Sequence, residues 1–105
     1  MNIQEKISQQ VKTDAIVLYM KGIPQAPQCG FSAATVQLLQ DSGAKDFTAI
    51  DVLSDPEIRA GIKTYSSWPT VPQLFVGGEF VGGADIVREM HEQGELQKLV
   101  TSVMA

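Results

Sequence analysis

The sequence predicts a small α/β protein in which a four-stranded mixed sheet is flanked by helices. Two observations lead to this fold class. Helix-like and strand-like segments alternate along the first part of the chain, which is typical of parallel β-α-β units. A glycine pair then joins two short apolar segments, which predicts an antiparallel hairpin. With 105 residues, 44% of them hydrophobic, the chain has the length and composition of one compact domain.

Two helices and one strand are predicted in the first 43 residues. Residues 3–12 carry isoleucine or valine at every fourth position, which indicates one buried helix face. Residues 15–20 form a continuous apolar run, short enough for a strand that is buried on both faces. Residues 21–28 contain two prolines and a glycine, so we expect a loop without strand pairing. Helical spacing returns over 31–39, with Phe31 on the apolar face, ahead of a glycine stop at position 43.

The next segment predicts a strand followed by a helix. Residues 47–51 are the second strand candidate. Residues 54–57, Ser-Asp-Pro-Glu, combine a capping residue with an early proline, which predicts a helix start. We expect this helix to continue to about Tyr65.

A hairpin and two helices complete the prediction. Residues 73–76 and 79–81 flank Gly77-Gly78, the signature of a two-residue hairpin turn. Helices are expected over 85–93 and 95–102. The whole order is α-β-α-β-α-β-β-α-α.

Composition and charge exclude several classes of protein. The net charge is −4, so the chain lacks the positive field by which proteins bind phosphate backbones. One cysteine allows no internal disulfide, which fits a reducing compartment. The longest apolar run is too short to span a bilayer. We therefore expect a cytoplasmic protein that binds neither nucleic acid nor membrane, although the mature form of an organelle protein would look the same.

Cys29 is the candidate reactive residue. It lies directly after the loop that follows the first predicted strand, at the predicted N-terminus of a helix, where backbone amides favour an anion. Lys21 lies upstream across the loop and adds a positive charge. Both features favour the thiolate. The alternative is a buried, inert cysteine, which the flanking proline and glycine make the weaker interpretation.

Two further residues have structural interpretations. Trp68 is expected in the core, although it is also a candidate for a binding platform. His91 is the only histidine, and its place in an amphipathic helix indicates a surface role rather than a metal site.

Four motifs follow one another along the chain: Lys21-Gly-x-Pro, Cys29-Gly-Phe-Ser, Trp68-Pro-Thr-Val-Pro-Gln, and Gly82-Gly followed by Asp85-Ile. Together they resemble the motifs of the monothiol glutaredoxins of the CGFS type. The resemblance covers residues 15–99 and implies a thioredoxin-like fold, with residues 1–105 forming a single glutaredoxin domain.

The resemblance also implies how glutathione binds. Val71 precedes a proline that is cis in this family, and its backbone would pair with the cysteinyl part of the tripeptide. Lys21 and Arg59 would hold the glycine carboxylate, with Lys63 as an additional candidate. Considered alone, Arg59 is a solvated charge on a helix.

The other end of glutathione would lie against the helix that begins near residue 84. The family pattern assigns the γ-glutamyl carboxylate to the amides near Gly83 to Asp85, Ala84 included, and the ammonium group to the Asp85 side chain. Considered alone, Asp85 is a helix cap. Many relatives carry a second cysteine where this chain has Ala84, so chemistry that resolves a disulfide with that thiol is excluded.

A cluster carrier is the function that the resemblance favours. A 2Fe-2S cluster needs four terminal ligands. Cys29 and one glutathione from each of two protomers would supply them, so the cluster would bridge a homodimer. Members of the family deliver such clusters to iron-sulfur acceptor proteins.

Two alternatives remain open. In the first, Cys29 makes the protein a glutathione-dependent thiol-disulfide oxidoreductase, although the long loop before Cys29 is associated in the family with weak activity. In the second, the chain forms a cluster-bridged heterodimer with a BolA-like partner.

Overall fold

The computed structural model describes residues 1–104, and its centre is a four-stranded mixed sheet. The strands are β1 (Ile16–Met20), β4 (Thr48–Asp51), β5 (Gln73–Val76) and β6 (Glu79–Gly82). Their order across the sheet is β4-β1-β5-β6. β1 pairs in parallel with β4, and both other pairs are antiparallel. The predicted mixed sheet is confirmed.

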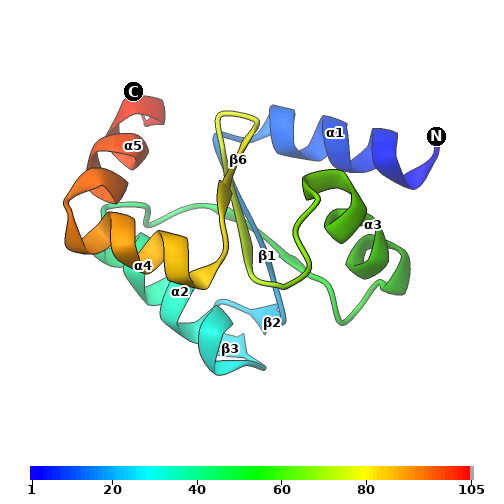
Figure 1. Cartoon of the computed structure of the whole chain (residues 1–105), viewed down its shortest axis with the longest axis horizontal. Coiled ribbons are helices and arrows are strands. Elements are labelled where there is room, and N and C mark those ends of the chain that lie inside the picture. Colours follow the sequence, from blue (N-terminus) through cyan, green and yellow to red (C-terminus); the bar gives the residue numbers. More distant parts are fainter. Residues whose placement is uncertain (105) are drawn as a thin grey trace.

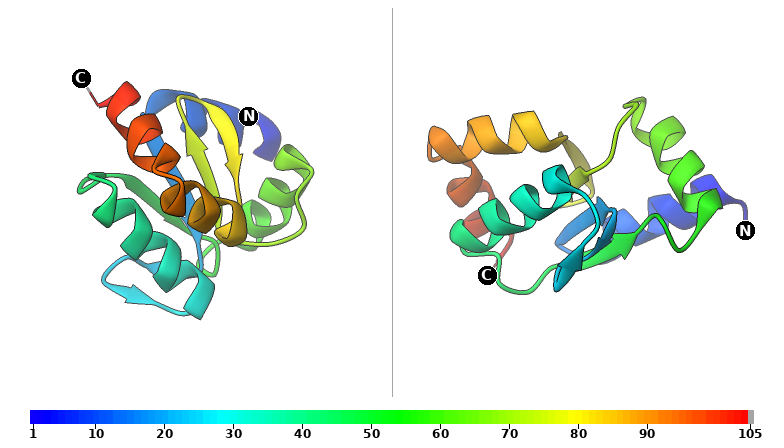
Figure 2. Two further views of the ribbon diagram at one scale, coloured as in Figure 1. Left: turned by 60° about the vertical axis from the view of Figure 1, so that its left-hand side comes forward. Right: turned by 90° about the horizontal axis from the view of Figure 1, so that it is seen from below.

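The helices form one layer on each side of this sheet (Figure 1). One layer consists of α1 (Ile3–Thr13) and α3 (Pro56–Ser66). The other layer consists of α2 (Gly30–Asp41), α4 (Ala84–Glu92) and α5 (Glu95–Val103). Figure 2 shows the same separation from two further directions.

The alternation of side chains along β1 explains why two cores form. All five residues of β1 are buried. Ile16, Leu18 and Met20 pack into the cluster beneath α2, α4 and α5, whereas Val17 and Tyr19 pack into the cluster beneath α1 and α3. Successive side chains of a strand point to opposite faces, so a continuous apolar run becomes a strand covered on both sides.

The start of α3 follows the predicted capping pattern. Asp55 is the N-cap, and its carboxylate accepts hydrogen bonds from the backbone N–H groups of Glu57 and Ile58. Pro56 occupies the first helical turn, where the missing N–H removes no helical hydrogen bond. The helix therefore begins at a defined residue, which fixes the positions of Arg59 and Lys63.

The hairpin prediction is confirmed in its turn as well as in its strands. Gly77 and Gly78 connect β5 to β6, with φ angles of +60° and +83°. A turn with two positive φ angles matches the twist of the flanking strands, and glycine adopts it without a steric penalty. The predicted helices and strands otherwise begin and end within about two residues of the observed ones.

The prediction that residues 21–28 form no ladder is wrong. β2 (Gly22–Ile23) and β3 (Ala26–Pro27) form a short antiparallel pair. Pro27 is tolerated because a two-stranded ribbon has free edges, where a missing N–H breaks no ladder. The segment before Cys29 is consequently a small hairpin. Within residues 1–104, no helix has the length and hydropathy needed to cross a membrane.

Candidate functional site

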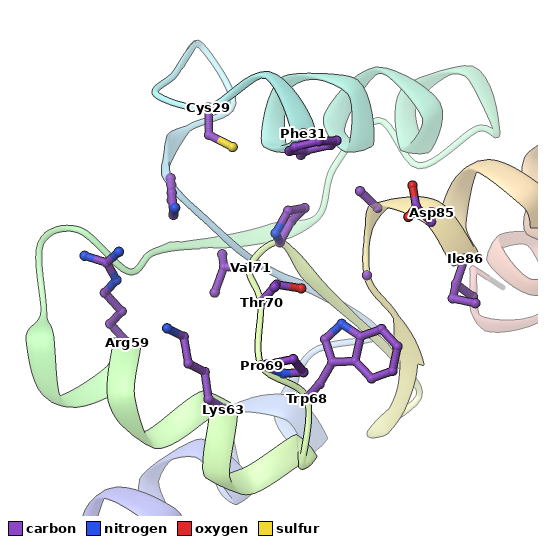
Figure 3. A pocket seen from close by; sticks show the side chains of 14 residues that line it. Cys29, Phe31, Arg59, Lys63, Trp68, Pro69, Thr70, Val71, Asp85 and Ile86 are labelled. Carbon is purple, nitrogen blue, oxygen red and sulfur yellow. The ribbon is translucent and has the colours of Figure 1, made fainter.

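A cleft of about 440 Å³ lies beside Cys29 (Figure 3). Its walls come from the end of β1, the start of α2, the exposed face of α3, the 68–72 loop and the start of α4. The residues that the sequence analysis selected all line this cleft: Lys21, Cys29, Arg59, Lys63, Val71, Gly83, Ala84 and Asp85. The fold thus brings together residues that are far apart in the sequence, from Lys21 to Asp85.

Cys29 is the N-cap of α2 and is partly exposed. The backbone N–H of Ser32 lowers the pKa of the Cys29 thiol. The Phe31 N–H, the Ser32 hydroxyl and the Lys21 ammonium lower it further, against partial burial, which raises it. These are the amides and the cation expected at a helix N-terminus, so the cysteine is a reactive thiolate candidate and not an inert core residue.

Ser32 has a structural task that the sequence analysis missed. Its side chain is fully buried, and its hydroxyl oxygen accepts a hydrogen bond of 3.1 Å from the Lys21 N–H. This bond joins the loop after β1 to the first turn of α2. Ser32 therefore helps to position Lys21 and Cys29 relative to each other.

Three cations form one rim of the cleft. Arg59 and Lys63 lie one turn apart on α3 and extend toward Cys29 (Figure 3), and Lys21 directly follows β1. Within the described residues the only ion pair joins Asp85 and Arg88, so none of the three is neutralised by an acidic side chain. Such a rim is suited to binding a carboxylate.

The start of α4 forms the opposite wall. Gly83 is the N-cap, so the alternative interpretation of Asp85 as the helix cap is wrong. Asp85 instead lies in the first turn, where its carboxylate accepts a hydrogen bond of 3.1 Å from the exposed Arg88. The wall thus combines free backbone amides with one negative side chain, a set that matches an α-amino acid group.

The cleft floor is the segment before β5. The Val71–Pro72 peptide bond is cis, as the resemblance implied, and Val71 is buried beneath the cleft. Gln73, which is fully buried, donates from Nε2 to the carbonyl oxygens of Trp68 and Thr70, at 3.1 and 3.0 Å. The sequence analysis placed Gln73 in a strand but did not identify this support of the loop.

The expectation of a core position for Trp68 is wrong. Its side chain is 37% exposed, lines the cleft, and packs against Phe80 with ring centroids 5.8 Å apart. Gly83 makes room for this indole, because a Cβ at position 83 would lie 2.9 Å from the indole Nε1.

Phe31 also differs from the prediction. The spacing of 31–39 put it on the apolar face of α2, but the buried face consists of Ser32, Thr35, Val36 and Leu39, and Phe31 is 63% exposed. Together with Trp68 and Ile86 it forms an apolar rim around the cleft. The sequence signal that could have indicated the exposure of Phe31 was its position two residues after the candidate thiol, Cys29.

A mixed sheet between helix layers, with one thiol at a helix N-terminus facing a cleft, defines a thiol protein of the thioredoxin-like class. The chain belongs to the glutaredoxin family, whose family model matches residues 16–81. It is 52% identical to glutaredoxin 4 of Escherichia coli K12 over 101 residues, which are 96% of this chain and 87% of that protein. With its single cysteine it is therefore a monothiol glutaredoxin similar to glutaredoxin 4.

A second relative is longer than this chain. Glutaredoxin-related protein 5, mitochondrial, of Danio rerio is 50% identical over 100 residues, which are 91% of this chain and 64% of that protein. The chain therefore spans slightly less than two thirds of that relative's length.

Solved structures confirm the thioredoxin-like fold. The solution structure of reduced poplar apo GrxS14 has a TM-score of 0.83 and 43% identity, covering 97% of this chain and 93% of that chain. The crystal structure of a buckwheat glutaredoxin–glutathione complex has a TM-score of 0.83 and 27% identity, covering 96% of this chain and 89% of that chain.

Proposed function

We propose that the protein binds glutathione in this cleft and carries a glutathione-ligated 2Fe-2S cluster that bridges two protomers. The observation that carries the proposal is the isolated, partly exposed Cys29 at the edge of a cleft with a cationic rim. The glutathione complex of the buckwheat relative supports the first part. The family relationship to glutaredoxin 4 supports the second.

Glutathione would lie across the cleft with its two ends on opposite walls. Lys21 and Arg59 take the glycine carboxylate, and Lys63 is close enough along α3 to assist. The backbone of Val71 pairs with the cysteinyl part.

The γ-glutamyl group then meets the start of α4. Its carboxylate takes the amides of Gly83 and Ala84, and its ammonium group takes the carboxylate of Asp85. A thiolate from the tripeptide would lie beside Cys29.

One protomer does not supply enough ligands for a cluster. Within residues 1–104, no group of three or more histidine, cysteine or acidic side chains could hold a metal ion. A 2Fe-2S cluster needs four terminal ligands, and Cys29 is one. Two Cys29 thiolates and two glutathione thiolates from a homodimer complete the set. The apolar rim of Phe31, Trp68 and Ile86 would lie at the protomer interface, where apolar side chains gain from burial.

The cluster is cargo in this proposal. A cluster whose ligands include a dissociable tripeptide is released more easily than a cluster held by four protein ligands. Transfer of the cluster to iron-sulfur acceptor proteins is therefore the proposed role. A BolA-like protein would replace one protomer in a heterodimer. We further propose that residues 1–105 act as one glutaredoxin domain, and that the unpaired thiol functions in the reducing cytoplasm.

The lowered pKa of Cys29 favours a second candidate function, a glutathione-dependent oxidoreductase. The Cys29 thiolate would attack the glutathione sulfur of a glutathionylated protein, and the protein thiolate would leave. A second glutathione thiolate would then attack the mixed disulfide, releasing glutathione disulfide and the Cys29 thiolate. With Ala84 where relatives carry a second cysteine, no other thiol of the chain can resolve it.

Anaerobic reconstitution with iron and sulfide tests the carrier function. We expect the visible absorbance of a 2Fe-2S cluster only when glutathione is present. Arg59→Gln should reduce cluster retention, whereas Lys98→Gln, which removes an exposed cation on α5, should not. Equal retention in both variants would contradict the proposed glutathione position, and absence of a cluster would contradict the carrier function. Cys29→Ser removes both the cluster and thiol activity, so it does not separate the two candidate functions.

A further inference from the structure

Asp51, at the end of β4, is not among the cleft residues but is bonded to the segment that carries Lys21. One carboxylate oxygen, Oδ1, accepts two backbone hydrogen bonds of 2.9 Å, from the N–H groups of Gly22 and Leu53. In the parallel pairing of β1 with β4, Asp51 lies opposite Met20, which is the residue before Lys21. Asp51 has no cationic partner within residues 1–104.

Three hydrogen bonds hold the backbone on the two sides of Lys21: one on the Met20–Lys21 peptide and two on the Lys21–Gly22 peptide. The Lys21 N–H donates to the Ser32 hydroxyl at 3.1 Å, and the Lys21 carbonyl accepts from the Gln28 N–H at 2.9 Å. The Gly22 N–H donates to Asp51. The first two bonds connect Lys21 to α2 and to the β2–β3 hairpin, and the third connects the start of β2 to the end of β4. Without Asp51, the hairpin would be connected to β4 through one contact fewer at the residue that follows Lys21.

The backbone of Gly22 is closely surrounded. Its φ is +88°, and a Cβ there would lie 2.7 Å from the Ala26 carbonyl oxygen and 2.8 Å from the Gln28 backbone nitrogen. Its backbone is thus enclosed by β3 on one side and bonded to Asp51 on the other. The planar Lys21–Gly22 peptide includes the Cα of Lys21, so the bond from the Gly22 N–H to Asp51 helps to hold this Cα in place, together with the bond from the Lys21 N–H to Ser32.

We propose that Asp51 is a positioning residue of the glutathione cleft, which holds Lys21 on the cationic rim through the Gly22 N–H. This proposal rests on the proposed function, because it concerns the binding of glutathione in the same cleft. The positioning requires the Oδ1 oxygen of Asp51 as a hydrogen-bond acceptor, and it does not require the negative charge of the carboxylate. Asp51→Asn retains an oxygen at this place, whereas Asp51→Ala removes it.

Glutathione binding to the reduced, cluster-free chain tests this by isothermal titration calorimetry. We expect Asp51→Ala to weaken binding about tenfold, as for loss of one charged contact, and Asp51→Asn to stay within about twofold of the wild type. Amide exchange followed by NMR should show a faster exchange of the Gly22 N–H in Asp51→Ala only. Asn2→Ala is the matched control, since it removes a side-chain acceptor for a backbone N–H at the start of α1, which does not line the cleft.

Three results would overturn the inference: wild-type affinity in Asp51→Ala, equal weakening in Asp51→Asn, or equal weakening in Asn2→Ala. Each variant is compared under conditions where urea unfolding shows that it is fully folded. A wild-type chain that binds no glutathione would contradict the proposed function instead. In that case the Gly22 exchange rate alone decides whether Asp51 anchors the hairpin, with an unchanged rate in Asp51→Ala overturning it.

Discussion

Gln73→Met removes the support beneath the cleft floor while keeping the volume of the side chain. The change deletes the two hydrogen bonds from Nε2 to the carbonyls of Trp68 and Thr70. A neutral hydrogen bond contributes roughly 0.5–1.5 kcal/mol, which gives roughly 1–3 kcal/mol for the pair. Oε1 of Gln73 is buried without a hydrogen-bond partner, so removing this oxygen offsets part of the loss. We therefore expect the free energy of unfolding to fall by about 1–2 kcal/mol.

The functional part of this prediction separates loop positioning from general stability. Urea unfolding measures the free energy, and calorimetric titration measures glutathione affinity. Gln4→Met is the control, because it deletes one comparable hydrogen bond, of 3.0 Å to the Gly61 carbonyl, between α1 and α3. We expect Gln73→Met to weaken glutathione binding and Gln4→Met to lower stability alone. Unchanged affinity in Gln73→Met, measured on folded protein, would refute the idea that Gln73 shapes the cleft.

Three further predictions concern charge and protonation. Arg59→Gln should weaken glutathione binding by about 1.4 kcal/mol, or tenfold, in a calorimetric titration, and Lys98→Gln should leave it unchanged; equal effects would mean that Arg59 acts only through net charge. Ser32→Ala should raise the pKa of the Cys29 thiol, followed by thiolate absorbance against pH, because the hydroxyl that lowers the pKa is lost; a lower pKa would contradict this. The pKa of the Cys29 thiol is lower in the folded than in the unfolded protein, so the Cys29 thiolate stabilises the fold. This stabilisation is fully present above the thiol pKa of the unfolded protein and is lost as pH falls through the thiol pKa of the folded protein. The stability difference between the wild type and Cys29→Ser should accordingly increase with pH up to the usual thiol pKa in urea unfolding, and a constant difference would argue against the shift.

Local sequence signals predicted most of the helices and strands, because each signal acts within its own segment. The apolar run of 15–20, the Asp55-Pro56 helix start and the Gly77-Gly78 turn each determine their own segment. The short pair β2–β3 was missed because a two-residue strand has no periodicity, and because Pro27 is normally evidence against pairing.

The cleft residues were predicted in part, because motifs identify chemical groups but not their neighbours. The eight selected residues converge on one cleft, while their roles toward glutathione remain proposals. Burial and packing are tertiary properties, so residue type did not predict the exposure of Trp68, and helical spacing did not predict that of Phe31. The same holds for the support that Gln73 and Asp51 give to the loops, since each bonds to a segment that the fold brings alongside it.

Native mass spectrometry of the reconstituted protein decides between a shared and a single-chain cluster site. We predict one species with two chains, two glutathione molecules and one 2Fe-2S cluster, which dissociates to monomers when glutathione is removed. A cluster held by one chain, or by two chains without glutathione, would contradict the proposal that Cys29 supplies one of four ligands shared between two protomers.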